Sequence, residues 1–354
     1  MDMTGAKYNI SYGSSSGNLT ATSDKTSVNL LSLISGTNYF VSVVTVGARW
    51  YGSSPVTTSV YTKPMSVKSP QISNVTPSSV SLTWSKPDEY QTFYSYRVQT
   101  NVSSSSSLIN NTIVTSDSAT IMNLTPGETY TFMVYTRAAD GLTESDPVSL
   151  STCTVPAQVS SISLNNSQSV DTLRIAWPNP GGKVDYYNVS ITGAVSNTIQ
   201  TTTTQVTVPG LLPGREYSVT VQTVSGSCSQ TSAPVTEATY PTPPGNIIFT
   251  TITPKTLTFS WMEPVNMTGV NKSYNISYGI FSSSNITVTS STTNVTTLQN
   301  LISGTNYSIS VVTVGARGYG SSPLTTSVYT NTKKAIEKMV MDKSIVKEKA
   351  DTIP

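Results

Sequence analysis

The stretch ISGTNYFVSVVTVGARWYGSSP, residues 34–55, returns almost unchanged at residues 302–323 as ISGTNYSISVVTVGARGYGSSP. Nineteen of the 22 positions are the same, at an offset of 268 residues. Weaker copies lie between the two stretches, because a leucine followed six positions later by a tyrosine recurs every 87 to 91 residues, at Leu33/Tyr39, Leu124/Tyr130, Leu211/Tyr217 and Leu301/Tyr307. The chain therefore contains four repeats, and the near identity of the outer two indicates a recent duplication.

Within each repeat, apolar residues alternate with polar ones, as in Val80/Leu82/Trp84, Tyr187/Val189/Ile191 and Tyr307/Ile309/Val311. A period of two is typical of β-strands with one buried face, and Pro and Gly separate the runs. About seven such strands in some 90 residues predict a β-sandwich. The expected fold class is all-β.

These residues resemble fibronectin type III domains. The shared features are a Trp in the second strand (B), Tyr-x-Val/Ile in the third (C), and Leu-x-Pro-Gly-x-x-Tyr before the sixth (F). LTPGETY at 124–130 and LLPGREY at 211–217 carry the last motif, whereas LISGTNY replaces its proline by serine. More narrowly, VTPSSVSLTW, DYYNVSITG and SVVTVGARGYGSSP resemble repeats in the ectodomains of receptor-type tyrosine phosphatases with a single catalytic domain, the eta, beta and H group.

The resemblance implies tandem, immunoglobulin-like β-sandwiches, three of them complete. Residues 1–63 form a first repeat, followed by complete repeats at 64–152, 153–239 and 240–330 and by a Lys-rich, disordered tail at 331–354. We call them repeats 1 to 4. In this fold Trp84, Trp177, Trp261 and the four repeated tyrosines are structural residues.

Repeat 1 lacks its beginning. Residues YNISY at 8–12 match YNISY at 274–278, which is strand C of repeat 4. Strands A and B and their core tryptophan therefore have no counterpart in repeat 1. A sheet without its partner exposes its apolar face, so we expect residues 1–63 to be unstable alone and sensitive to proteases.

The composition excludes most enzyme classes. The 354 residues include no histidine, and charged residues make up 11% with a net charge of +2. No Ser-His-Asp or Cys-His pair can form, and neither cysteine fits the His-Cys-x5-Arg pattern of the phosphatases. We expect a non-catalytic protein without cofactor, metal or small-molecule substrate. The balanced charge gives no reason to expect nucleic acid as a partner.

Fourteen Asn-x-Ser/Thr sequons favour a glycosylated, extracellular or cell-surface protein. Their acceptors are Asn9, Asn18, Asn74, Asn101, Asn110, Asn123, Asn165, Asn188, Asn266, Asn271, Asn275, Asn285, Asn294 and Asn306. The first residues do not resemble a signal peptide, and no apolar run is long enough to span a membrane. This combination favours a piece of a larger protein.

The two cysteines belong to repeat 3. Cys153 precedes strand A, and Cys228 lies in the loop between strands F and G, so both are expected at one end of the sandwich. An oxidising compartment favours a disulfide that closes a loop of about 75 residues. Two free, partly buried thiols are the alternative.

The loops between strands F and G (FG loops) of repeats 1 and 4 are the candidate contact sites. They contain Arg49, Trp50 and Tyr51 in the first copy and Arg317 and Tyr319 in the second. Arg, Trp and Tyr are favoured interface anchors, and loops at the end of a sandwich carry function. The alternative is ordinary loop composition, with glycines chosen for the turns.

Two functions fit these observations. One is a segment of a receptor ectodomain, similar to that of the phosphatases, which spaces or presents a site for a protein ligand or a lateral receptor partner. The other is a secreted or matrix adhesion protein, although neither RGD nor LDV occurs. The tail, NTKKAIEKMVMDKSIVKEKADTIP, is expected to be solvated, with a short partner-binding helix as the alternative.

Overall fold

The structure is a computed structural model that describes residues 6–15, 17–47, 50–281 and 286–332. Two compact units make up the chain. The first unit is Met1–Ala157 together with Gly181–Asp185 and Val224–Gln230, and the second is Gln158–Pro180, Tyr186–Thr223 and Thr231–Pro354. Nearly all of the expected tail lies outside the described residues. All the strands among the described residues pair antiparallel, and the only helical positions there are in short 3-10 turns, so the all-β prediction is confirmed.

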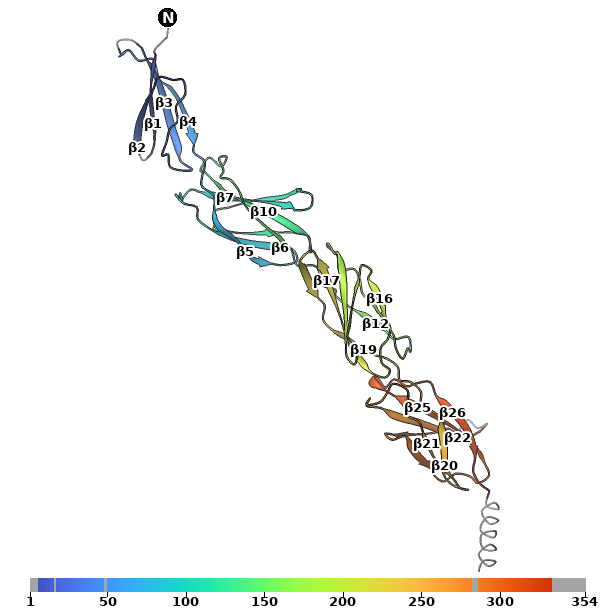
Figure 1. Ribbon diagram of the computed structural model, residues 1–354. Coiled ribbons are helices and arrows are strands. Elements are labelled where there is room, and N and C mark those ends of the chain that lie inside the picture. The colour runs from blue at the N-terminus through green and yellow to red at the C-terminus, as the bar shows by residue number, and fades with distance from the viewer. Residues whose placement is uncertain (1–5, 16, 48–49, 282–285, 333–354) are drawn as a thin grey trace, which may run out of the picture. The chain divides into compact units, whose positions relative to one another are not determined.

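Repeat 1, in the first unit, is a single antiparallel sheet (Figure 1). Its strand order is β2 (Gly17–Ser23), β1 (Lys7–Ser14), β3 (Asn38–Val46) and β4 (Val56–Tyr61). The described residues of this repeat form no second sheet. Residues 27–30, which match β24 (Val295–Leu298) of repeat 4, are not in a strand here.

Repeat 2, also in the first unit, is a complete sandwich of two sheets. One sheet contains β5 (Lys68–Val75), β6 (Ser79–Ser85) and β9 (Ser118–Met122). The other has the order β11 (Val148–Cys153), β10 (Thr129–Arg137), β7 (Ser95–Val102) and β8 (Leu108–Val114). Alternate residues of both sheets form one core, with Leu82, Val98 and Phe132 fully buried. The period of two in the sequence is thus the spacing of inward-facing side chains.

Repeat 3 contributes most of its strands to the second unit. β12 (Ser163–Asn165), β13 (Leu173–Ala176) and β16 (Gln205–Val208) form one sheet. The other contains β15 (Asn197–Thr201), β14 (Tyr186–Thr192), β17 (Glu216–Ser225) and β18 (Cys228–Thr231), with β19 (Val235–Ala238) also paired to β17. The last strand is interrupted at Ser232–Pro234, because proline has no N–H for the ladder.

Repeat 4 lies wholly in the second unit and has the same two sheets. β20 (Ile247–Ile252), β21 (Leu257–Trp261) and β24 (Val295–Leu298) face the sheet of β23 (Thr287–Ser291), β22 (Ser273–Ile280), β25 (Asn306–Val314) and β26 (Leu324–Tyr329). The strands β22, β25 and β26 correspond to β1, β3 and β4 of repeat 1. The duplicated stretch therefore forms one central strand, β3 or β25, and the loop that follows it in both repeats.

The repeated tyrosines make the same hydrogen bond in all four repeats. The backbone N–H of the residue five positions before each tyrosine donates to its hydroxyl, with N–O distances of 3.0, 2.9, 2.8 and 3.0 Å in repeats 1 to 4. Trp84, Trp177 and Trp261 are at most 6% exposed. These positions are structural, as the resemblance implies.

The residues GSSP, which end the duplicated stretch, also have a structural role. In repeats 1 and 4 the N–H of Thr45 and of Thr313 donates to the hydroxyl of the first serine, Ser53 or Ser321, at 3.1 and 3.0 Å. The serine thus replaces a strand partner where the last strand bends away, and the proline behind it cannot extend the ladder.

Candidate interaction site at the FG loops

The FG loop of repeat 4 is a tight turn between β25 and β26. A 3-10 turn, Ala316–Gly318, sits inside a bridge between Val314 and Gly320. Arg317 has a φ of 57°, so it occupies the left-handed region at the tip of the loop. This turn projects the Arg317 side chain away from the sandwich of repeat 4.

Arg317 contacts the end of repeat 3 where strands β17 and β19 pair. Its Nη2 donates to Glu216 Oε1 at 2.9 Å and to the Thr236 carbonyl at 2.8 Å. Its Nε donates to the same carboxylate oxygen at 3.2 Å, and its Nη1 lies 3.8 Å from Glu237 Oε1. Because Arg317 donates to it, the pKa of the Glu216 carboxyl lies below its ordinary value.

Tyr319 contacts the same end of repeat 3. Its hydroxyl donates to Glu237 Oε1 at 2.8 Å, and this hydrogen bond raises the pKa of the Tyr319 phenol. Its ring stacks on Tyr240, with ring centroids 4.7 Å apart and an interplanar angle of 7°. The Glu237 carboxylate therefore accepts a hydrogen bond from Tyr319 and also lies near Arg317.

The FG loop of repeat 4 and repeat 3 also make a backbone contact. Ala316 N donates to the Gly214 carbonyl at 3.1 Å. A Cβ added to Gly315 would lie 3.0 Å from Gly214 Cα, so a side chain there would force the two loops apart. We call the contacts of Ala316, Arg317 and Tyr319 with repeat 3 the FG clasp. Arg317 and Tyr319, the sequence candidates for ligand contact, are thus engaged within the chain.

Sequence reasoning missed the partners in the clasp. Glu216 pairs with Ala238 across β17 and β19, so Glu216 and Glu237 lie at the end of repeat 3 that leads into repeat 4. Carboxylates are sparse in this chain, and Glu237, close to the end of repeat 3, was the signal that the sequence offered. Tyr240 lies just beyond them in the linking segment.

The described residues of the FG loop of repeat 1 form the same bridged turn. Gly47 N donates to the Tyr51 carbonyl at 3.1 Å, and Val46 bridges to Gly52. The side chains of Trp50 and Tyr51 are 84% and 78% exposed. Arg49 lies outside the described residues. The two aromatic rings are among the most exposed large apolar side chains of the described chain.

The two cysteines are brought together in the first unit. Cys153 and Cys228 are joined by a disulfide with their Cα atoms 6.2 Å apart. Near them, Lys183 Nζ lies 3.0 Å from Glu128 Oε1, and the Ser225 hydroxyl donates to the Gly127 carbonyl at 2.8 Å. Loops of repeat 3 and the corner of repeat 2 thus share both a covalent bond and polar contacts.

The sequon asparagines lie on the outside of the sheets. Ten are exposed: Asn9, Asn18, Asn74, Asn110, Asn123, Asn165, Asn266, Asn271, Asn275 and Asn294. Three are half-buried, Asn101, Asn188 and Asn306, and Asn285 lies outside the described residues. Asn188, Asn275 and Asn306 alternate with buried residues, which is the outward register predicted from the sequence.

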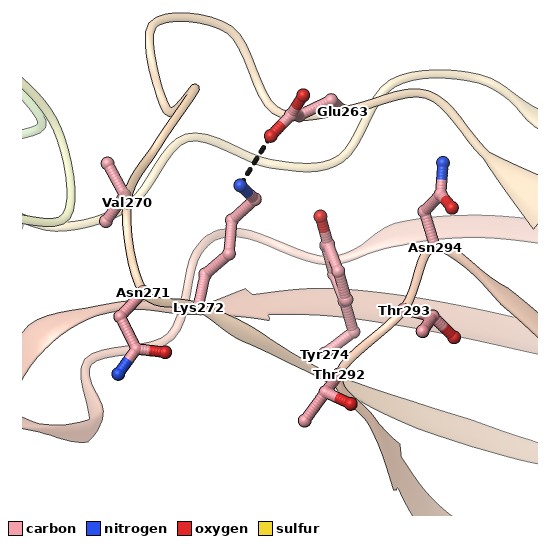
Figure 2. A pocket seen from close by; sticks show the side chains of 8 residues that line it. All are labelled: Glu263, Val270, Asn271, Lys272, Tyr274, Thr292, Thr293 and Asn294. Carbon is pink, nitrogen blue, oxygen red and sulfur yellow. Dashed lines mark hydrogen bonds and ion pairs between the residues drawn. The ribbon is translucent and has the colours of Figure 1, made fainter.

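One hollow of about 530 Å³ in repeat 4 was not predicted from the sequence. Figure 2 shows its lining, with Lys272 reaching Glu263 above the ring of Tyr274. Lys272 Nζ donates to Glu263 Oε1 at 2.5 Å and to the Met267 carbonyl at 3.0 Å, so the lysine is already satisfied. Asn271 and Asn294, both sequon acceptors, stand on its rim.

Two further observations concern the described residues. None of their helices is long and apolar enough to cross a membrane. No group of three or more Asp, Glu or Cys side chains among them could hold a metal ion.

The fibronectin type III domain model matches residues 65–151, 157–238 and 242–329. Receptor-type tyrosine-protein phosphatase eta of Gallus gallus is 32% identical over 171 residues, which cover 48% of this chain and 12% of that protein. Tenascin-R of Homo sapiens is 29% identical over 270 residues, 73% of this chain and 19% of that protein. Receptor-type tyrosine-protein phosphatase eta of Homo sapiens is 29% identical over 245 residues, which cover 64% of this chain and 18% of that protein.

The chain spans less than a fifth of the length of these three relatives. The three matched domains coincide with repeats 2 to 4, and fibronectin type III domains are non-catalytic. The two-sheet sandwiches, the buried tryptophans Trp84, Trp177 and Trp261, and the hydrogen-bonded tyrosines of repeats 2 to 4 lie within the matched residues. Because the matched domains cover more than half of its residues, the chain belongs to the fibronectin type III family.

Proposed function

We propose that the chain is a non-catalytic, extracellular array of fibronectin type III repeats that spaces and presents a protein-binding site in a receptor ectodomain of the receptor-type tyrosine phosphatase kind. The observation that carries the proposal is the FG clasp. It joins the end of one repeat to a loop of the next by charge-assisted hydrogen bonds, ring stacking and backbone contact. A spacer needs such contacts, because a bare linker would leave successive repeats free to reorient.

The presenting part of the proposal rests on repeat 1. Its FG loop carries two exposed aromatic rings, Trp50 and Tyr51, on a turn held by backbone hydrogen bonds. Exposed aromatic side chains on a fixed loop are typical anchors of protein interfaces. The partner is therefore a protein ligand or a lateral receptor partner, rather than a nucleic acid or a small molecule.

Two double variants of the full chain test the spacer role and the presenting role separately. Arg317→Ala/Tyr319→Ala should let repeats 3 and 4 tumble independently, measured by 15N relaxation, without weakening binding to cells. Trp50→Ala/Tyr51→Ala should leave the relaxation of repeats 3 and 4 unchanged and should reduce cell binding at least tenfold. Unchanged cell binding in the second variant would remove the presenting role, and unchanged relaxation in the first would remove the spacer role.

The extracellular location is supported by the exposed sequons and by the Cys153–Cys228 geometry. A disulfide closing this loop would stabilise the fold by about 4 kcal/mol in the chain-entropy model. The test is alkylation, without reduction, of protein secreted from cells, followed by mass spectrometry. We expect both cysteines to be blocked from alkylation and several sequon asparagines to carry glycans. Alkylated thiols and bare sequons would contradict the location.

A second candidate function is that of a secreted or matrix adhesion protein. The similarity to tenascin-R, which extends over 73% of this chain, favours it. The sequence of the full-length transcript separates the two candidates. A transmembrane segment followed by a cytoplasmic domain supports the receptor, and an open reading frame with neither supports the matrix protein.

A further inference from the structure

The sheet of repeat 1 carries an aromatic ring where repeat 4 has a serine. Phe40 of β3 corresponds to Ser308 of β25 within the duplicated stretch. Its side chain is 66% exposed and lies on the face opposite the buried Tyr39. In repeat 4 the strands β20 and β21 pack on the other face, that of Tyr307. Because serine serves at the same place in the same strand of repeat 4, the strand itself does not require this ring.

Phe40 lines a hollow of about 530 Å³ between repeats 1 and 2, both of which belong to the first unit. We call it the junction hollow. Tyr61 of repeat 1 and Phe93 of repeat 2 add two more rings to its lining. Neutral polar groups of the lining come from Thr37, Asn38 and Gln91. None of the described residues that line it is charged, and its volume is that of a small-ligand pocket, about 300–1,000 Å³.

The two repeats contact each other directly beside the junction hollow. The Ser35 N–H donates to Glu89 Oε2 at 2.8 Å, and the Tyr94 hydroxyl donates to the Ser35 carbonyl at 3.0 Å. Lys63 Nζ lies 2.5 Å from Asp146 Oδ1. The hollow is therefore bounded by residues of both repeats that hydrogen bonds and an ion pair hold together.

The sequon acceptor Asn18 stands in line with Phe40. Asn18 of β2 pairs with Gly13 of β1, and Gly13 pairs in turn with Phe40 of β3. Residues paired in this way project from the same face of a sheet, so the three form one row. Two strand spacings, about 10 Å, separate Asn18 from Phe40. Because Gly13 has no side chain, the row is open between them.

The carboxamide of Asn18 leans over this glycine. A Cβ added to Gly13 would lie 2.1 Å from Asn18 Oδ1, so the exposed Asn18 side chain extends toward Phe40. A half-turn of the amide exchanges Oδ1 with Nδ2, the atom that carries the sugar in a glycosylated asparagine. A glycan on Asn18 therefore begins near the rim of the junction hollow, and its first two sugars span the remaining distance to the rings.

We propose that the glycan on Asn18 packs into the junction hollow. Its first two sugars lay their C–H faces on the rings of Phe40 and Phe93, because the face of an aromatic ring attracts partly positive hydrogen atoms. Their hydroxyl and acetamido groups bond to the amides of Asn38 and Gln91, which both donate and accept. The proposal rests on the extracellular location proposed above, since only an exported chain acquires this modification.

A tethered glycan suits this hollow better than a free partner. Attachment to Asn18 gives the sugars an effective concentration on the order of millimolar at the hollow, as for any short flexible tether. Sugars near the protein in an N-linked glycan are neutral, with apolar C–H faces and hydrogen-bonding groups. The lining has the same character, with aromatic rings, amides and a hydroxyl and no charge.

The first test measures how well the protein shields the glycan. The full chain is expressed behind an added signal peptide, in cells that make oligomannose glycans, and is treated while folded with an endoglycosidase that cuts between the first two sugars. Mass spectrometry follows cutting at Asn18 and at Asn9, which lies on the same face of β1 four residues from Gly13. We expect Phe40→Ala/Phe93→Ala to speed cutting at Asn18 at least tenfold and to leave cutting at Asn9 unchanged.

The variant Val44→Ala/Ile113→Ala is the matched control. It also shortens one side chain on the outer face of β3 and one in repeat 2, and neither residue lines the junction hollow. Cutting at Asn18 should stay as slow as in the unmodified chain. Unchanged cutting at Asn18 in the aromatic variant, or equal acceleration at Asn9, would overturn the proposal. So would an Asn18 that carries no glycan while other sequons do.

The second test measures how well the glycan shields the rings, with the lining intact. Hydroxyl-radical footprinting reports the exposure of Phe40 and Phe93, and Tyr51, 78% exposed in the FG loop, is the internal reference. Asn18→Gln removes the glycan and should raise oxidation of both rings at least threefold, whereas Asn9→Gln should leave it unchanged. Rings that stay shielded in Asn18→Gln would indicate another occupant and overturn the proposal.

These tests separate the packing of the glycan from the location of the protein. The added signal peptide sends the chain through the secretory pathway whatever its native location. A failure of either test therefore contradicts the packed glycan and leaves the extracellular location standing, because the alkylation experiment above tests that location by itself.

Discussion

Repeats 1 and 4 contain nearly the same strands in different surroundings. β3 and β25 differ at two of nine positions, and both are followed by the same bridged turn. Tyr39 and Tyr307 accept the same hydrogen bond, at 3.0 Å in each repeat. Burial nevertheless alternates fully along β25 and only weakly along β3. Local sequence therefore specifies strand and turn, whereas the facing sheet decides whether the apolar side chains become a core.

The two FG loops extend this comparison to the surface. In repeat 4 the loop meets two carboxylates of repeat 3 and the ring of Tyr240 in the linking segment, and Tyr319 is half-buried there. In repeat 1 the corresponding Tyr51 is 78% exposed. The same loop sequence is therefore part of a junction in repeat 4, which its own residues do not reveal.

The largest expected effect is on the free energy of unfolding, and it distinguishes Trp261 of repeat 4 from Trp50 of repeat 1. Trp261→Ala should destabilise repeat 4 by about 3 to 5 kcal/mol, because it removes a buried ring that packs on Tyr274 and leaves a cavity. Trp50→Ala should change stability by less than about 0.5 kcal/mol, because the ring is exposed. Urea unfolding of the full chain, followed repeat by repeat by NMR, measures both. Similar losses would mean that Trp50 has a structural role.

A matched pair of valines sharpens the comparison. Val311→Ala should cost about 2 kcal/mol, from two buried methyl groups at about 0.8 kcal/mol each and a cavity term. Val43→Ala should cost less than about 1 kcal/mol, because its side chain remains partly in water. The two substitutions are chemically identical, so the difference between them measures the cover supplied by β20 and β21. Equal costs in the same urea experiment would mean that repeat 1 is already a closed core.

The smallest expected effect is the pH dependence of the FG clasp. The pKa of Glu216 is lowered by the hydrogen bonds from Arg317, so the clasp is complete above the ordinary value for glutamate, about 4.3, and weakens as the pH falls below it. Arg317 stays charged throughout. We expect 15N relaxation to show repeats 3 and 4 moving more independently at low pH. Arg317→Ala should remove this pH dependence, and Arg174→Ala, on the side of repeat 3, should keep it.

The sequence predicted much of the fold because its signals were local. Alternation located most strands, and the spacing of Leu211 and Tyr217 located the corner. The missing strands in repeat 1 could be predicted because repeat 4 supplied a complete copy for comparison. We did not anticipate that residues 27–30 are not in a strand. Their sequence still resembles that of β24, but the strand with which β24 pairs in repeat 4 has no counterpart here.

The candidate site was less predictable than the fold. The loop composition singled out Arg317 and Tyr319, but nothing local distinguishes a loop that binds a ligand from one that binds the preceding repeat. The clasp depends on Glu216, Glu237 and Tyr240, which lie about 80 to 100 positions away in the sequence. Predicting such long-range pairs requires knowing how one repeat is placed against the next. The hydrophobic periodicity of the sequence carries no information about that placement.

Native-state hydrogen exchange of the unmodified full chain tests the central claim most directly. The amides of β3 and β25 have almost the same sequence, and therefore almost the same intrinsic exchange rates, within one molecule. The account predicts that β3 exchanges at least a hundredfold faster than β25, because opening β3 breaks no facing sheet. Equal protection of the two strands would contradict the claim that repeat 1 is an open sheet.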